Sequence, residues 1–216
     1  SFFGAFFYFM FRQAHISRAK GDIGKTDDGI RSLENGAVIN AKAENGSVYL
    51  QGAGEKDTGL VVDSISATGN AKLNLDGNVN FGNGAGNGSI SADGDVTVNG
   101  NDVNLNAGTV TAGGASDITA KGDVNVTTGS ITAKGAGNIT AGNDVNLNAG
   151  TVAAGGASDI TAKGDVNVTT GSITADGASN ITAGNDVNLN AGTVTASGAS
   201  NINAGNDVNV TTGSIT

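Results

Sequence analysis

Residues 101–141 read NDVNLNAGTVTAGGASDITAKGDVNVTTGSITAKGAGNITA and contain the pattern from which the fold can be predicted. It consists of two similar halves that begin 21 residues apart, at Asn101 and Gly122. A fixed period of this length is typical of a solenoid, in which each turn stacks on the turn before it. The same Asp-Val-Asn motif starts, with no shift in register, at Asp102, Asp123, Asp144, Asp165, Asp186 and Asp207.

Each repeat contains three short alternations of apolar and polar residues. Alternation with a period of two, carried by β-branched residues, predicts strands rather than helices. Three short strands per turn of about 21 residues predict an all-β fold, a three-sided parallel β-helix, with strands about 4.8 Å apart. The residues expected to point inward in the first repeat are Val103, Leu105, Val110, Ala112, Ile118 and Ala120.

The outward positions and the corners also form columns. Asparagine recurs at Asn104, Asn125, Asn146, Asn167, Asn188 and Asn209, which predicts a stacked ladder. Glycine or asparagine occupies the corners, and these residue types tolerate positive φ best. The column restricted to these two types therefore predicts a left-handed corner residue on every turn. Its members are Asn101, Gly122, Asn143, Gly164, Asn185 and Asn206. Two further corner columns contain only glycine and start at Gly108 and Gly114.

Three regions are expected along the chain: a hydrophobic and then basic segment at 1–20, divergent solenoid turns with longer corners at 21–94, and regular repeats at 95–216. The first segment begins SFFGAFFYFMF and is predicted to cap the first turn or to contact another subunit; a remnant of a targeting segment or a membrane contact is the alternative. It is too short to cross a bilayer, which takes about 20 apolar residues, so no transmembrane span is predicted.

Composition restricts the chemistry of the chain. The formal net charge of −9 disfavours nucleic acid as a partner. Residues 95–216 contain no His, Cys, Arg, Glu or Tyr, which excludes catalytic triads and transition-metal clusters there. We therefore predict no catalytic residues and no enzyme activity. A polysaccharide-active β-helix enzyme is the weaker alternative, because no aromatic residue follows Phe81.

The aspartate column and the columns of outward hydroxyls each allow two interpretations. The aspartates Asp102, Asp123, Asp144, Asp165, Asp186 and Asp207 are expected either to cap corners by accepting backbone N–H groups or to bind Ca²⁺ between turns. The first interpretation predicts no cofactor. Paired outward hydroxyls resemble the threonine arrays of ice-binding solenoids, with Ala153 interrupting the array: Thr109 and Thr111, Ser130 and Thr132, Thr193 and Thr195, Ser214 and Thr216.

A family resemblance rests on two stretches. The run GDIGKTDDGIRSLENGAVINAKAENGSVYLQG at 21–52 and the repeats GNDVNLNAGTVTA…GSITA resemble segments of filamentous-haemagglutinin-like exoproteins. That resemblance implies a right-handed parallel β-helix secreted to the surface of Gram-negative cells, often by two-partner secretion, with roles in adhesion, biofilm or toxin delivery. We expect the shaft of a filamentous adhesin or the subunit of an extracellular fibre, with a host surface or glycan as ligand.

Assembly end to end is the last expectation. The final strand, Ser214-Ile215-Thr216, carries no polar cap, and unpaired strand groups recruit other strands. A head-to-tail contact that does not close builds a filament. The residues expected to make this contact are Phe2, Phe3, Phe6, Phe7, Tyr8, Phe9, Phe11, Ser214, Ile215 and Thr216.

Overall fold

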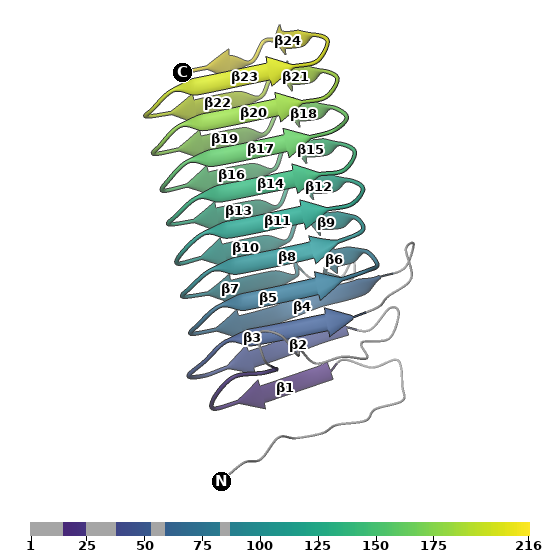
Figure 1. Cartoon of the computed structure of the whole chain (residues 1–216), viewed down its shortest axis with the longest axis vertical. Helices are drawn as coiled ribbons and strands as arrows, with labels where there is room; N and C mark the ends of the chain where they lie inside the picture. The colour runs from purple at the N-terminus through teal and green to yellow at the C-terminus, as the bar shows by residue number, and fades with distance from the viewer. Residues whose placement is uncertain (1–14, 25–37, 53–58, 83–86) are drawn as a thin grey trace.

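A computed structural model describes residues 15–24, 38–52, 59–82 and 87–216 of the chain. The described residues form parallel strands stacked in about eight turns of roughly 21 residues, with no helix. Figure 1 shows the turns piled along the long axis of the molecule, with the last strands at the end opposite to β1. The predicted all-β solenoid is confirmed.

The solenoid has three faces, each a ladder of parallel strands. The first face consists of β6 (Val79–Phe81), β9 (Val103–Asn106), β12 (Val124–Thr127), β15 (Val145–Asn148), β18 (Val166–Thr169), β21 (Val187–Asn190) and β24 (Val208–Thr211). The second face consists of β7 (Ser89–Ala92), β10 (Thr109–Ala112), β13 (Ser130–Ala133), β16 (Thr151–Ala154), β19 (Ser172–Ala175), β22 (Thr193–Ala196) and β25 (Ser214–Ile215). The third face consists of β3 (Val48–Gly52), β5 (Ala71–Leu75), β8 (Val96–Gly100), β11 (Ser116–Ala120), β14 (Gly137–Ala141), β17 (Ser158–Ala162), β20 (Ser179–Ala183) and β23 (Ser200–Ala204).

The first turns lack one corner. The strands β1 (His15–Ala19), β2 (Val38–Ala43) and β4 (Leu60–Ala67) pair with one another in order, and β4 pairs with both β6 and β7. Only Asp63 separates the part of β4 on the first face from the part on the second. The turns at 21–94 were expected to diverge and to have longer corners; at this corner the strand crosses between the faces with a bulge instead of a loop.

The core is the column of inward side chains. All six residues predicted to point inward in the first repeat are buried, and their counterparts in later turns stack on them in register. Burying a large aliphatic side chain contributes about 1.5–3 kcal/mol. Each turn shares its buried surface with the turns on either side, so stability comes from stacking.

A seventh inward position escaped the sequence analysis. Ser116, Ser158 and Ser179 begin strands of the third face and are fully buried. Their hydroxyl oxygens have no hydrogen-bond partner in the described part of the chain. An unpaired buried hydroxyl costs about 1–3 kcal/mol. The alternation that places Ile118 in the core also places Ser116, two residues earlier, on the inward side, so the sequence contains the signal for this column.

The corner prediction is wrong in its detail. Positive φ of 54–57° occurs at the residue before each glycine of the column that starts at Gly108, and this residue is alanine or threonine: Ala107, Thr128, Ala149, Thr170, Ala191 and Thr212. Elsewhere in the described residues it occurs only at Gly24, Gly59 and Gly82. Glycine follows each left-handed residue because the neighbouring turn leaves no room for a side chain. A Cβ added at Gly129 would lie 2.7 Å from the carbonyl oxygen of Leu105 and 2.8 Å from that of Gly108.

Candidate functional site

The outer side of the first face carries the predicted asparagine ladder. In each turn the side-chain Nδ2 donates to the Oδ1 of the asparagine one turn earlier, at 2.9 Å, from Asn104 to Asn209. An asparagine amide has two N–H groups and two acceptor lone pairs. The ladder uses one of each, so every amide between Asn104 and Asn188 keeps one donor and one acceptor for other partners.

A second outward column lies two residues further along the same strands. Its members, alternately asparagine and threonine, are Asn106, Thr127, Asn148, Thr169, Asn190 and Thr211. Within the described residues, their side chains make no hydrogen bond to another protein group. This column was not predicted as a site from the sequence, although its alternation with the ladder is visible there.

The two columns line a shallow hollow of about 440 Å³. We name it the asparagine groove and define it by its lining residues, which are Asn146, Asn148, Asn167, Thr169, Asn188, Leu189, Asn190, Asn209 and Thr211. It runs across β15, β18, β21 and β24, and therefore along the stacking direction of the turns. None of the lining residues carries a charge, and apart from Leu189 all of them have an amide or hydroxyl side chain.

The six repeat aspartates occupy the corner that leads into the first face. Each backbone N–H from Asp123 to Asp207 donates to Oδ1 of the aspartate one turn earlier, at 2.8–3.1 Å. Asn78 accepts the N–H of Asp102 in the same way. This is the corner-capping geometry expected for such residues. The described residues include no group of three or more acidic or histidine side chains placed to hold a metal, and calcium binding stays a prediction.

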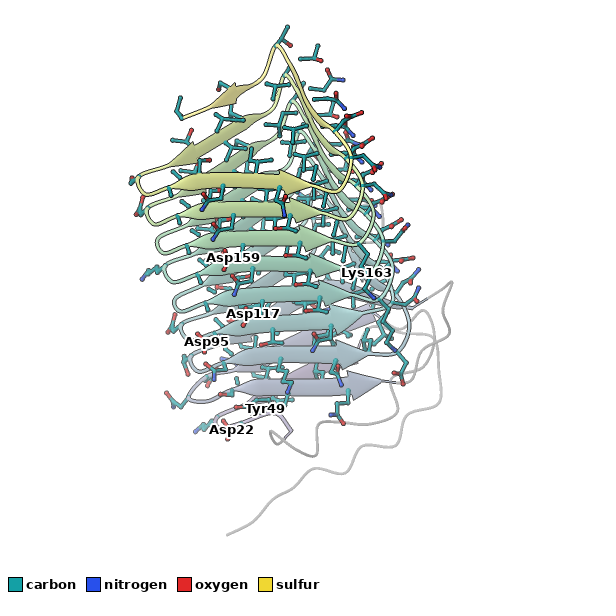
Figure 2. The ribbon with its side chains drawn as sticks, turned by 45° about the horizontal axis from the view of Figure 1, so that its top comes forward. Asp22, Tyr49, Asp95, Asp117, Asp159 and Lys163 are labelled. Carbon is teal, nitrogen blue, oxygen red and sulfur yellow. The ribbon has the colours of Figure 1, made fainter. Side chains whose placement is uncertain are left out.

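A mixed ladder of acids and amides crosses the third face. Figure 2 labels Asp117 and Asp159 on two strands of this sheet. Asn138 donates to Asp117 at 2.7 Å, and Asn180 donates to Asp159 at 2.6 Å. The Oδ1 of Asn138 is buried and has no partner, because the next residue in its column is Asp159, whose carboxylate has no N–H to offer.

We expect Asp159→Asn to stabilise the protein. The new amide can donate to Asn138 Oδ1 while still accepting from Asn180, so a buried acceptor gains a hydrogen bond worth about 1 kcal/mol. The matched control is Asp117→Asn, because Asp117 follows Thr97 in its column and has no unpaired amide oxygen before it. Thermal unfolding should show a midpoint higher by about 2–4 °C for the first variant alone. Equal shifts in both variants would contradict the role of Asn138.

The predicted hydroxyl array lies on the outer side of the second face. Thr109 and Thr111 stack in register on Ser130 and Thr132, and later turns continue both columns. Ala153 interrupts one of the columns, as the sequence indicates. The stacking is therefore confirmed, and ice binding by this array stays a prediction.

The residues predicted for assembly are only partly described. The aromatic residues at positions 2–11 lie outside the described residues. Ser214 and Ile215 form β25, which pairs with Thr193 and Val194 of β22. Val208, Val210 and Ile215 are 47%, 46% and 40% exposed, although the equivalent residues one turn earlier are buried. An end-to-end contact stays a prediction.

The comparisons with known proteins bear on the repeats. Residues 153–216 match the family model of the haemagglutinin repeat. Neither the comparison with curated proteins nor the comparison with solved structures found a match. The matched segment covers the last turns of the solenoid, and the stacked β-fold is consistent with a filamentous-haemagglutinin-like β-helix. Residues 153–216 therefore carry haemagglutinin repeats within a β-solenoid, the architecture of a structural repeat protein. The described part of the chain includes no helix long and apolar enough to cross a membrane.

Proposed function

We propose that this chain, a β-solenoid with haemagglutinin repeats at residues 153–216, is part of a stiff extracellular shaft in a filamentous adhesin or surface fibre. The observation that carries the proposal is the haemagglutinin-repeat match on an unbroken stack of turns. Haemagglutinin repeats occur in secreted, surface-associated proteins, which suggests an extracellular location.

The bonding between turns supports a mechanical role. Consecutive turns are joined by backbone ladders on all three faces. The asparagine ladder and the aspartate caps add side-chain bonds in the same direction, for example from Asn167 to Asn146 and from Asp165 to Asp144. Separating two turns therefore requires many hydrogen bonds to break together, which makes the stack resistant to bending and extension. Side chains on the outer faces are free to contact surfaces outside the cell.

End-to-end association belongs to the same proposal. The exposed Val208 and Val210 occupy the columns of the buried Val187 and Leu189, so a further stacked turn would cover them with apolar surface. Such a turn can continue the same chain or belong to another copy, and in the second case the stack would grow as a filament. The aromatic segment at 1–11 is the part of the chain that we propose contributes to that contact.

Immunogold electron microscopy of intact cells that produce the protein tests this function. We expect gold particles on filaments outside the cell, and we expect a chain lacking residues 1–11 to reach the surface without forming them. Labelling that appears only after permeabilisation would reject the extracellular shaft. Filaments of unchanged length from the shortened chain would reject the aromatic contact and leave the shaft standing.

A further inference from the structure

We propose that the asparagine groove binds a linear, uncharged polysaccharide laid along the axis of the solenoid. This rests on the proposed adhesin function and deepens it, because it names the face of the solenoid and the class of glycan. The proposal rests on three properties of the groove: unused hydrogen-bonding groups, absence of charge, and a repeat that follows the turns.

The unused groups include both hydrogen-bond donors and acceptors. Asn146, Asn167 and Asn188 are held rigidly by the ladder, each with one N–H and one lone pair unused. Asn148 and Asn190 are exposed, and their amides make no hydrogen bond within the described part of the chain. Sugar hydroxyls both donate and accept, so they can pair with each of these groups. The fixed ladder amides are already oriented, which lowers the entropy cost of binding.

The charge of the groove selects among polymers. Its lining contains no charged side chain, whereas the chain as a whole carries a net charge of −9. A polyanion such as heparin would find no cation in the groove and would be repelled by the surrounding charge. A neutral polymer with many hydroxyl groups meets neither obstacle.

The repeat of the groove favours a long ligand over a small one. The ladder amides recur at each turn, about 4.8 Å apart along the axis, and the exposed asparagines of the second column recur at every second turn. Rings in an extended pyranose chain follow one another at a comparable spacing, so successive sugars meet equivalent amides. The groove lacks an aromatic side chain on which a sugar can stack, so each sugar contributes little and affinity grows with the number of turns occupied.

Two other occupants fit the groove less well. An extended peptide usually binds by adding to a free strand edge, but β15, β18 and β21 are each paired on both sides. Of the groove strands only β24, at the end of the groove, has an unpaired edge, so a peptide could add there but not along the groove. A second copy of the same face would bring one hollow against another. Close interdigitation of identical faces needs complementary surfaces, which two hollows do not provide.

Native affinity electrophoresis of the full chain tests the proposal. Gels would contain one of three neutral polymers, hydroxyethyl cellulose, galactomannan or mixed-linkage β-glucan, or the polyanion heparin. We expect at least one neutral polymer to slow migration and heparin to have no such effect. The double variant Asn148→Ala, Asn190→Ala should bind the retarding polymer on the order of tenfold more weakly, because two hydrogen-bonding positions are lost.

The matched control is Thr119→Ala with Thr161→Ala, two exposed outward positions on the third face. It should bind like the unaltered chain, and thermal unfolding should show that both double variants remain folded. The proposal is overturned if none of the three neutral polymers retards the chain, if heparin retards it equally, or if the groove variant binds as well as the control. Retardation that disappears on dilution together with dimers in solution would instead assign the face to a second copy.

Discussion

Gly150→Ala is expected to destabilise the protein by about 2–3 kcal/mol, the upper part of the usual range for overpacking. A Cβ at this position would lie 2.7 Å from Val126 Cγ1 and 3.0 Å from Val126 Cβ, with the Val126 carbonyl oxygen closer still. The atoms in the way include the backbone of Val126, which is held by the pairing of β12 with β15. Moving this backbone to relieve the clash would cost free energy. Equilibrium unfolding in urea measures the loss.

The adjacent position provides the control for this prediction. Ala149 has a φ of 54°, which a residue with a side chain adopts at a cost, and its side chain is exposed. Ala149→Gly should therefore leave stability unchanged or raise it by up to about 1 kcal/mol. If both variants lower the free energy of unfolding equally, it is wrong that Ala149 carries the positive φ while Gly150 is required for close approach of the neighbouring turn.

Deleting residues 143–184, two whole turns, should leave a folded protein. The deletion brings β21 onto β12, where Val187, Asn188 and Leu189 replace Val145, Asn146 and Leu147 with identical side chains. Because each turn contacts only its neighbours, the remaining interfaces are preserved. Circular dichroism should show β structure, and small-angle scattering should show a particle shorter by about 10 Å.

A deletion out of register should fail in the same assay. Removing only residues 143–152 takes out β15 and the first half of β16, so the rest of that turn cannot reach around the three faces. Strand pairing shifted by one residue also turns buried side chains toward water. We expect a large loss of β signal from the turns after the cut. Equal folding of both deletions would show that the 21-residue turn is not the unit of stability.

The sequence by itself determined the parts of the fold that depend on periodicity. An alternation of two residues states which side chains point inward, and a constant period states which residues lie above one another. The inward positions Val103, Leu105 and Ile118 and the asparagine ladder follow from these two rules alone, and all are found as predicted. The same rules applied fully would also have given the buried Ser116 column and the second column of the asparagine groove.

Only the tertiary structure decided what depends on distances between neighbouring turns. The left-handed residue lies at Ala149 rather than at Gly150, because Gly150 is needed where the previous turn blocks a side chain. The first turns cross one corner at Asp63 without a loop, and Asn138 keeps an unpaired oxygen because of the residue stacked on it. Residue type alone cannot distinguish a glycine required for its φ from one required for close approach. That choice is made by the atoms of the neighbouring turn, about 4.8 Å away.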